Sequence, residues 1–421
     1  MNTPTDSTDR SNAKMRIKHH ALECVMCGIC VPHCPTFALS HNEADGPRGR
    51  ISLALGLAGG TLALDAGVVA HLDGCLTCRA CESVCPSLVH YGELIDEVRD
   101  ALAHDEFESE TANTRPRAAS KRWIWLRHHV LSQRRVFGAI WTALSLLDRL
   151  KATDMIRRFG GRMGQILPPV LPRRFRPNGR ISTAPAPEAT TKTVGLFIGC
   201  TGESLNSDAV RASIIALNAL GYAVEIPTAQ VCCGAMHQHG GDISEATRLR
   251  AANRTAFADR NLSAIVVIGT ACASELQRDQ GDVPFMEITD FLAQVPDDQW
   301  PSLQPIPARV AIHLPCSQTR VLKQPRSTER LLQRIPELNL VPLATNDRCC
   351  GAAGMHVLMY PNQADALRAP KLEEIEQLNP DFVVSANIGC ATHIAVGLAS
   401  PVLHPVELIA KSLTTTHREV R

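Results

Sequence analysis

Eight of the sixteen cysteines in this 421-residue chain fall into two short runs with the same spacing. Each run has the form C-x₂-C-x₂-C-x₃-C and is followed by a proline. The first run contains Cys24, Cys27, Cys30 and Cys34, and the second contains Cys75, Cys78, Cys81 and Cys85. This spacing is typical of thiolates that hold a [4Fe–4S] cluster, because three sulfurs converge from one tight loop and the fourth comes from farther away. The sequence therefore predicts two such clusters.

The last cysteine of each run sets how the two clusters are shared. In two-cluster ferredoxins it ligates the cluster of the other run. We therefore predict one cluster on Cys24, Cys27, Cys30 and Cys85, and a second on Cys75, Cys78, Cys81 and Cys34. A zinc site or a disulfide framework fits less well, because zinc sites usually combine two C-x₂-C pairs and disulfide frameworks belong to small secreted chains.

The other eight cysteines belong to an internal repeat whose matching positions lie 116 to 118 residues apart. Each copy carries one cysteine, then a Cys-Cys-Gly unit, then another cysteine. The two sets are Cys200, Cys232, Cys233 and Cys272, and Cys316, Cys349, Cys350 and Cys390. Four thiolates per copy suffice for a further cluster. A redox-active thiol pair and buried free cysteines remain as alternatives.

The elements that must position these cysteines differ between the two ends of the chain. In the repeat, apolar runs such as Val194–Ile198 and Ile265–Ile268 alternate with helical stretches such as Asp208–Leu220, which predicts βαβ units and a mainly parallel sheet. Cysteines at strand ends then gather at the carboxyl edge of the sheet. The region around the first two runs is apolar and helical in pattern, and Tyr91–His104 predicts an amphipathic helix.

We therefore expect a multidomain α + α/β protein with three regions. They are an α-helical two-cluster ferredoxin-like domain at 1–110, a basic helical connector and linker at 111–192, and a duplicated cysteine-rich domain with parallel sheets at 193–421. The repeats span about 193–308 and 309–421. Between 115 and 180 the connector has sixteen Arg or Lys and two acidic residues, interleaved with Trp, Phe and Leu. This pattern predicts amphipathic helices whose basic face is solvated, or docks on an acidic partner or an anionic lipid surface.

Charge and hydropathy limit the remaining classes of function. A net charge of +1 gives no electrostatic reason to expect nucleic acid as a partner. The stretch Ile51–Leu72 carries one charge, Asp65, and is long enough to span a bilayer, but its glycines favour two short helices instead. The cysteine content and the polar Met1–Lys14 predict a reducing, cytoplasmic location. Peripheral attachment to the inner face of the cytoplasmic membrane stays open.

The order of these motifs resembles the iron–sulfur subunit of bacterial glycolate oxidase. The resemblance extends from Leu22 to Leu408 apart from the basic connector, and related subunits of lactate-utilisation, anaerobic glycerol-3-phosphate dehydrogenase and heterodisulfide reductase complexes share it. The strings that carry it are Gly46-Pro47-Arg48-Gly49-Arg50-Ile51, the second cysteine run from Cys75 to Pro86, and Ala386-Asn387-Ile388-Gly389-Cys390-Ala-Thr-His393.

The resemblance implies a membrane-associated complex that oxidises glycolate to glyoxylate. FAD would sit on two partner subunits, and electrons would pass through this chain toward quinone, so no residue of this chain is assigned to catalysis. The absence of a G-x-G-x-x-G, a Walker loop or an H-E-x-x-H agrees with a relay. Two alternatives stay open: the same relay for lactate or glycerol 3-phosphate, and a catalytic Cys-Cys-Gly site like that of heterodisulfide reductase.

The chain departs from the heterodisulfide reductase pattern at one point. There the Cys-Cys-Gly unit usually continues to a C-x₂-C pair. Here Cys272 is followed by Ala-Ser-Glu275, and Cys390 by Ala-Thr-His393. Glu275 and His393 are therefore candidate substitutes for the missing ligand.

Overall fold

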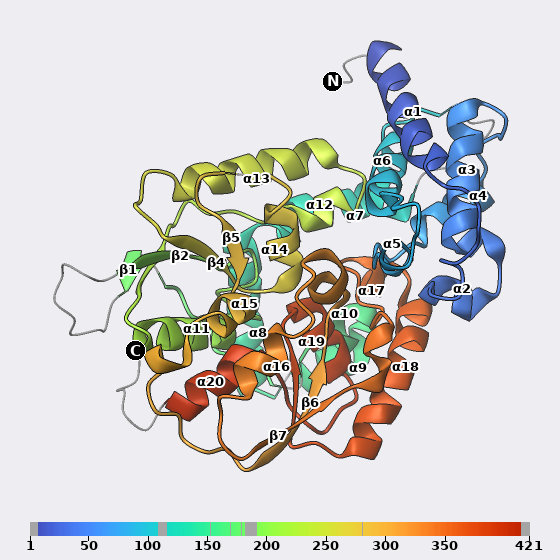
Figure 1. Ribbon diagram of the computed structural model, residues 1–421. Coiled ribbons are helices and arrows are strands. Elements are labelled where there is room, and N and C mark those ends of the chain that lie inside the picture. Colours follow the sequence, from blue (N-terminus) through green and yellow to red (C-terminus); the bar gives the residue numbers. More distant parts are fainter. Residues whose placement is uncertain are drawn as a thin grey trace.

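The computed structural model describes residues 7–107, 116–151, 153–168, 170–177, 179–181, 192–279 and 281–413. The predicted domain limit near residue 110 and most of the linker that ends at Lys192 lie outside the described residues. Figure 1 shows a helical N-terminal group set to one side of two sheet-containing units.

The N-terminal region is helical throughout its described part, as the sequence predicts. Its elements are α1 (Ser7–Leu22), α2 (Pro35–Ser40), η1 (Glu43–Asp45), α3 (Pro47–Gly59), α4 (Ala66–Asp73), α5 (Ala80–Ser83) and α6 (Tyr91–Ala103). The apolar stretch predicted as two short helices is α3 and α4, which confirms that prediction. Leu72 of α4 and Leu94 and Val98 of α6 lie fully buried in the apolar core of the N-terminal region. No helix in the described part of the chain is long and apolar enough to cross a membrane.

The connector is also helical, and it packs against the repeats. Its elements are η2 (Arg117–Ala119), α7 (Lys121–Leu126), the π-helix η3 (Arg127–Leu131), α8 (Arg134–Arg149), α9 (Thr153–Phe159) and α10 (Gly161–Gln165). Trp123 and Leu131 share an apolar cluster with Met236 and Met355, which follow the two Cys-Cys-Gly units. The connector thereby contacts both copies of the repeat close to their cysteines.

The two copies of the repeat form two sheets with the same strand order, which confirms the duplication and the parallel sheets. The first sheet has the order β1-β3-β2-β4-β5, and the second has β7-β6-β8-β9. The first contains β1 (Gly179–Ile181), β2 (Thr193–Phe197), β3 (Ala223–Ile226), β4 (Ala264–Val267) and β5 (Phe285–Glu287). The second contains β6 (Ala308–His313), β7 (Leu338–Pro342), β8 (Phe382–Ser385) and β9 (Val402–Leu403). Among the strands of the described residues, β1, which comes from the end of the connector, alone pairs antiparallel, on β3. The sequence did not predict this strand.

Helices from both copies meet in a shared apolar core. The first copy contributes α11 (Ser207–Ala219), α12 (Ala235–Gln238), α13 (Ile243–Phe257), α14 (Thr270–Leu276), α15 (Ile288–Ala293) and η4 (Asp297–Gln299). The second contributes η5 (Ser317–Val321), α16 (Ser327–Leu332), η6 (Ala344–Asp347), α17 (His356–Met359), α18 (Pro361–Leu378), α19 (Ile388–Ala395) and α20 (Pro405–Leu413). Ile214 of α11 and Ile409 of α20 belong to one fully buried cluster, and these helices lie side by side in Figure 1. Burial of each such side chain stabilises the fold by about 1.5–3 kcal/mol. Because residues of both copies belong to this cluster, the two copies form one packed body.

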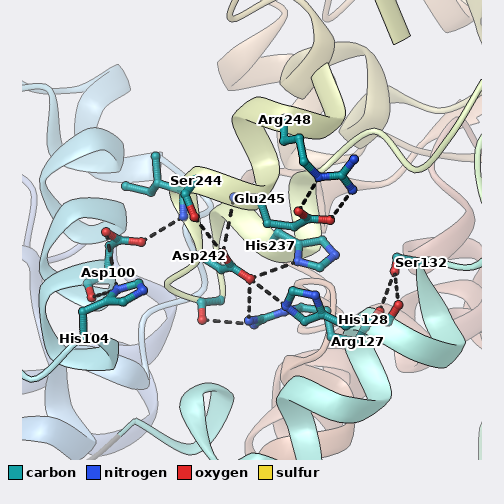
Figure 2. Close-up of polar contacts among 12 residues, drawn as sticks. Asp100, His104, Arg127, His128, Ser132, His237, Asp242, Ser244, Glu245 and Arg248 are labelled. Atoms are coloured by element: carbon teal, nitrogen blue, oxygen red, sulfur yellow. Dashed lines mark hydrogen bonds and ion pairs between the residues drawn. The ribbon is translucent and has the colours of Figure 1, made fainter. Parts of the chain in front are cut away.

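A polar junction joins the three regions around Asp242 (Figure 2). Arg127 Nη2 lies 3.5 Å and His128 Nε2 2.7 Å from Asp242 Oδ2, and His237 Nδ1 lies 3.4 Å from the same oxygen. The N-terminal region joins through Asp100, which accepts a hydrogen bond from the backbone N–H of residue 243 at 2.8 Å. Burial disfavours the charge on Asp242, but His237, Arg127 and His128 outweigh it and lower the pKa of this carboxyl well below its usual range.

Candidate functional site

The first cavity lies between the two N-terminal cysteine runs. Its lining includes the whole of one predicted ligand set, Cys24, Cys27, Cys30 and Cys85. Cys27 is exposed and the other three are partly buried. The turn through the first run needs Gly28, which has a φ of +81° and whose Cβ would stand 2.7 Å from Arg48 Nη1.

The second cavity adjoins the first, and its four cysteines are buried. It is lined by the other predicted set, Cys34, Cys75, Cys78 and Cys81, together with Arg50 and Tyr91. The side chain of Arg50 is 1% exposed, and it donates to His71 O at 2.6 Å and to Thr36 Oγ1 at 3.0 Å. Burial disfavours the guanidinium charge, but Tyr91, Cys75 and Cys34 outweigh it and raise the pKa of Arg50. A buried cation beside a cavity of thiols offsets the negative charge of thiolates.

The donor set of both cavities fits an iron–sulfur cluster. All eight cysteines are free thiols, and soft thiolates select iron–sulfur clusters among biological metal centres. Burial, with the neighbouring Cys349 as the next cause, raises the pKa of Cys78 to about 12. Burial also raises the pKa of Cys81. Such buried sulfurs become thiolates when a metal ion replaces the proton.

The first Cys-Cys-Gly unit brings its four cysteines together at the carboxyl edge of the first sheet. Cys200 follows β2, Cys232 and Cys233 precede α12, and Cys272 lies in α14. Cys200 and Cys233 donate hydrogen bonds to Cys232 and lower the pKa of that thiol. Cys233 also forms a hydrogen bond with Cys272. The four sulfurs therefore form one connected group, in which Cys232 and Cys233 are buried and Cys200 and Cys272 partly buried.

The second unit repeats this arrangement and adds a nitrogen donor. Hydrogen bonds from Cys316 and Cys350 lower the pKa of Cys349. Cys350 also forms a hydrogen bond with Cys390. One ligand atom each from His313, Cys350 and Cys390 lie within 4.8 Å of one another, and all three side chains are buried. Sequence reasoning missed His313. The available signal was its position at the end of β6, three residues before a repeat cysteine.

The two candidate substitutes, Glu275 and His393, are buried and have other partners in the structure. Glu275 is 2% exposed and accepts a hydrogen bond from Arg250 Nη1 at 2.5 Å. His393 is buried, and its Nε2 lies 3.1 Å from Ala364 O. Glu275 is thus held in an ion pair and His393 by one backbone hydrogen bond through Nε2, whereas His393 Nδ1 has no hydrogen-bond partner among the described residues.

The second cavity and the second Cys-Cys-Gly unit are in contact. Cys78 and Cys349 belong to one buried cluster with Leu76 and Ala80. Arg320 joins the two sides, because its Nη1 donates to Cys78 O at 3.3 Å. Since Cys81 lines both N-terminal cavities, three cysteine sites follow one another through the protein.

Two family models match the chain. The 4Fe-4S dicluster domain matches residues 20–89, and the cysteine-rich domain matches residues 194–277 and 310–395. These matches cover both N-terminal cysteine runs and both copies of the repeat. The chain therefore combines a region that matches the dicluster domain with two regions that match the cysteine-rich domain.

Curated proteins are similar to this chain over different lengths. The glycolate oxidase iron-sulfur subunit of Escherichia coli (strain K12) is 28% identical over 98% of this chain and 99% of its own. The probable glycolate oxidase iron-sulfur subunit of Bacillus subtilis (strain 168) is 26% identical over 90% of this chain and 89% of its own. Lactate utilization protein A of Geobacillus thermodenitrificans (strain NG80-2) is 29% identical over 51% of this chain and 98% of its own.

Proposed function

Since this chain resembles glycolate oxidase iron–sulfur subunits over nearly its whole length, we propose that it relays electrons in a glycolate-oxidising complex. FAD-containing partner subunits oxidise glycolate to glyoxylate, and quinone is the acceptor. In this proposal the chain holds one [4Fe–4S] cluster on Cys24, Cys27, Cys30 and Cys85 and another on Cys75, Cys78, Cys81 and Cys34. Such clusters accept and pass on single electrons.

The observation that carries this proposal is the succession of cysteine sites. The first cavity reaches the surface at Cys27, the second shares Cys81 with it, and Cys78 of the second packs on Cys349. A series of adjacent redox sites that starts at the surface and continues inward suits a relay. A single catalytic site would not need the first two members.

Iron content and electron paramagnetic resonance (EPR) of the anaerobically purified chain test the assignment. About eight irons fill the two N-terminal sites and about twelve fill one more, at four per cubane. Cys85→Ser should alter the centre that Cys24→Ser alters, and Cys34→Ser the centre that Cys75→Ser alters. If Cys85→Ser instead alters the centre that Cys75→Ser alters, and Cys34→Ser the centre that Cys24→Ser alters, the crossed ligation is wrong.

Reconstitution with the flavin subunits tests the function itself. Cys78→Ala should stop quinone reduction and leave glycolate oxidation with an artificial flavin acceptor intact. Reduction of the clusters by lactate or glycerol 3-phosphate, with no response to glycolate, would favour the alternative complexes. Loss of turnover in Cys350→Ala with both cubanes intact fits a relay and a catalytic Cys-Cys-Gly site equally well. Reduction of a disulfide substrate by the isolated chain would favour the catalytic site.

The flavin subunits would dock around Cys27. Large exposed apolar side chains lie in or close beside the chain segments that line the first cavity, namely Leu22, Val25, Met26, Ile29 and Leu88, which are 38% to 73% exposed. Met26 and Leu88 have φ values of +57° and +53°, a backbone conformation that costs of order 1 kcal/mol or more at such residues. An apolar centre around an exposed cluster ligand is what a redox partner needs, because it excludes water as the two proteins meet.

The connector would attach the complex to the membrane. On α8, Val136, Ile140 and Leu147 recur at helical spacing and are exposed, and the exposed Leu150 follows directly after the helix. Further exposed apolar residues follow on α9 and α10, namely Met155, Phe159 and Met163. Exposed basic residues accompany them, namely Arg135, Arg149, Lys151 and Arg158. Asp148 is partly buried and paired with Arg157. An apolar stripe with cations beside it fits the headgroup region of an anionic bilayer.

A further inference from the structure

The second Cys-Cys-Gly unit contains a histidine that converges on its sulfurs. His313, Cys350 and Cys390 are 2%, 2% and 6% exposed, and one ligand atom from each lies within 4.8 Å of the others. Cys316 and Cys349 join the same group through the thiol hydrogen bonds to Cys349 and Cys350. Four sulfurs and one imidazole nitrogen therefore share one buried site.

The imidazole is oriented by a partner on the next strand. His313 Nδ1 lies 3.0 Å from Ser385 Oγ at the end of β8, and both side chains are buried. Metal-ligating histidines almost always use one ring nitrogen for such a contact, which sets the tautomer and leaves the other nitrogen for the metal. The tandem of His313 and Ser385 thus has the form of a ligand with its orienting residue.

The first unit lacks this nitrogen at the corresponding position. Phe197 ends β2 as His313 ends β6, and it is fully buried in the apolar cluster that contains Cys232 and Cys233. A phenyl ring offers no lone pair to a metal. The two units therefore share a cysteine pattern but differ in their donor atoms.

A buried cation also marks the second unit. Lys371 of α18 is 1% exposed, and its Nζ donates to Thr345 O at 2.5 Å. Cys350 and Cys349 interact electrostatically with this ammonium. Positive charge at this place stabilises a site that gathers several thiolates, because it offsets their mutual repulsion.

We propose that His313 is a nitrogen ligand of an iron–sulfur centre held by Cys316, Cys349, Cys350 and Cys390, oriented by Ser385. This inference rests on the proposed electron relay, and it makes the two units unequal. The first is limited to thiolates, whereas the second has mixed sulfur and nitrogen ligation. Iron–sulfur centres with imidazole among their ligands have higher reduction potentials than centres with thiolates alone. The second unit, which adjoins the second cavity, then attracts electrons from it.

Isotope labelling with pulsed EPR tests the ligand directly. The full-length chain is purified anaerobically from cells fed ¹⁴N- or ¹⁵N-histidine, and the nitrogen coupling of its centres is compared. We expect one centre with a strong coupling that changes with the label. His313→Phe, which installs the residue of the first unit, should remove that coupling. His393→Gln, a buried histidine three residues beyond Cys390, should keep it.

A second variant separates ligation from packing. Ser385→Ala should keep the iron content and change the size of the nitrogen coupling, because the ring loses its orienting contact. This measurement also decides the matter if His313→Phe does not fold. An unchanged spectrum on labelling, or a coupling that persists in His313→Phe, overturns the inference.

Iron content distinguishes this inference from the proposed function. About eight irons, four per cubane, with no third centre would refute ligation by His313 and leave the relay standing. Iron missing from the two N-terminal sites would instead refute the relay.

Discussion

Cys78 of the second cavity and Cys349 of the second Cys-Cys-Gly unit lie in one buried cluster, although one is near the start of the chain and the other near its end. The Cys349 sulfur is one cause of the raised pKa of Cys78. Two buried thiolates at such proximity repel each other unless cations compensate them. This contact joins the second cavity to the second Cys-Cys-Gly unit.

Arg320 is the cation at this contact, and we predict that Arg320→Gln makes the second-cavity centre harder to reduce. Its guanidinium donates hydrogen bonds to Cys78 O and Asp347 O. The hydrogen bonds from Cys316 and Cys350 are the main causes of the lowered pKa of Cys349, and the charge of Arg320 lowers it further. Removing the charge disfavours the more negative, reduced state. EPR-monitored redox titration should show a more negative midpoint with unchanged iron content. The exposed Arg330 on α16 supplies the control, Arg330→Gln, and equal midpoints in both variants would contradict the prediction.

The glycine that ends each Cys-Cys-Gly unit should not tolerate a side chain, and the second should be the more sensitive. Gly351 has a φ of +85°, and its Cβ would stand 2.6 Å from Ala364 O, whereas Gly234 has a φ of +100° and 3.1 Å to Ala246 O. We expect Gly351→Ala to lower the free energy of unfolding by about 1–3 kcal/mol, and Gly234→Ala by less. Thermal unfolding of the intact chain measures this. Gly221→Ala, where φ is +81° and no atom lies within 4 Å, isolates the backbone cost.

Asp242→Asn should weaken the junction of the three regions. The pKa of Asp242 is lowered in the folded state, so its contribution to stability is complete above the unfolded pKa of about 3.9 and is lost as pH falls below that value. We expect a loss of roughly 2 kcal/mol at pH 7, and a smaller difference from the parent at pH 3.5. Melting curves at both pH values check this. The exposed Asp298→Asn should show neither effect, and a constant difference at both pH values would rule out the carboxylate as the cause.

Charges placed around Cys27 should block electron entry without harming the clusters. In Val25→Glu with Leu88→Glu, two side chains that are 68% and 73% exposed become anionic. We expect slower reduction of the chain by its flavin partner, at least tenfold, because each desolvated charge opposes docking. Reduction by dithionite should stay unchanged. Unaltered transfer from the flavin partner would place the docking surface elsewhere.

Charges on the outer stripe of α8 should release the chain from anionic bilayers. Ile140→Glu with Leu147→Glu removes two exposed apolar contacts and adds repulsion from anionic headgroups. Co-sedimentation with vesicles that contain phosphatidylserine should fall strongly, and added salt should weaken binding by the parent chain. The variant Val25→Glu with Leu88→Glu, which leaves α8 unchanged, serves as control. Parent chain that stays in solution, but binds the flavin subunits through α8, would assign this surface to a protein partner.

Local pattern was enough to find the redox residues and most of the elements. The spacing of Cys24, Cys27 and Cys30 lies within one loop, and the helical period of Tyr91–His104 depends on neighbours along the chain. The structure places the first three with Cys85 around one cavity, and it has a helix at Tyr91–Ala103. The strand order of the two sheets also follows the repeat, because similar segments pack in similar ways.

What the sequence by itself determined is therefore the number of cysteine sites, their donor type and the duplicated fold that carries half of them. Tertiary structure alone decided which sites touch and what else enters them. Arg50 is buried beside the second cavity, and His313 lies near Cys390 because β6 ends and α19 begins at the same sheet edge. The physical reason is range: spacing acts within a loop, whereas burial and charge compensation depend on segments brought together by the packed core.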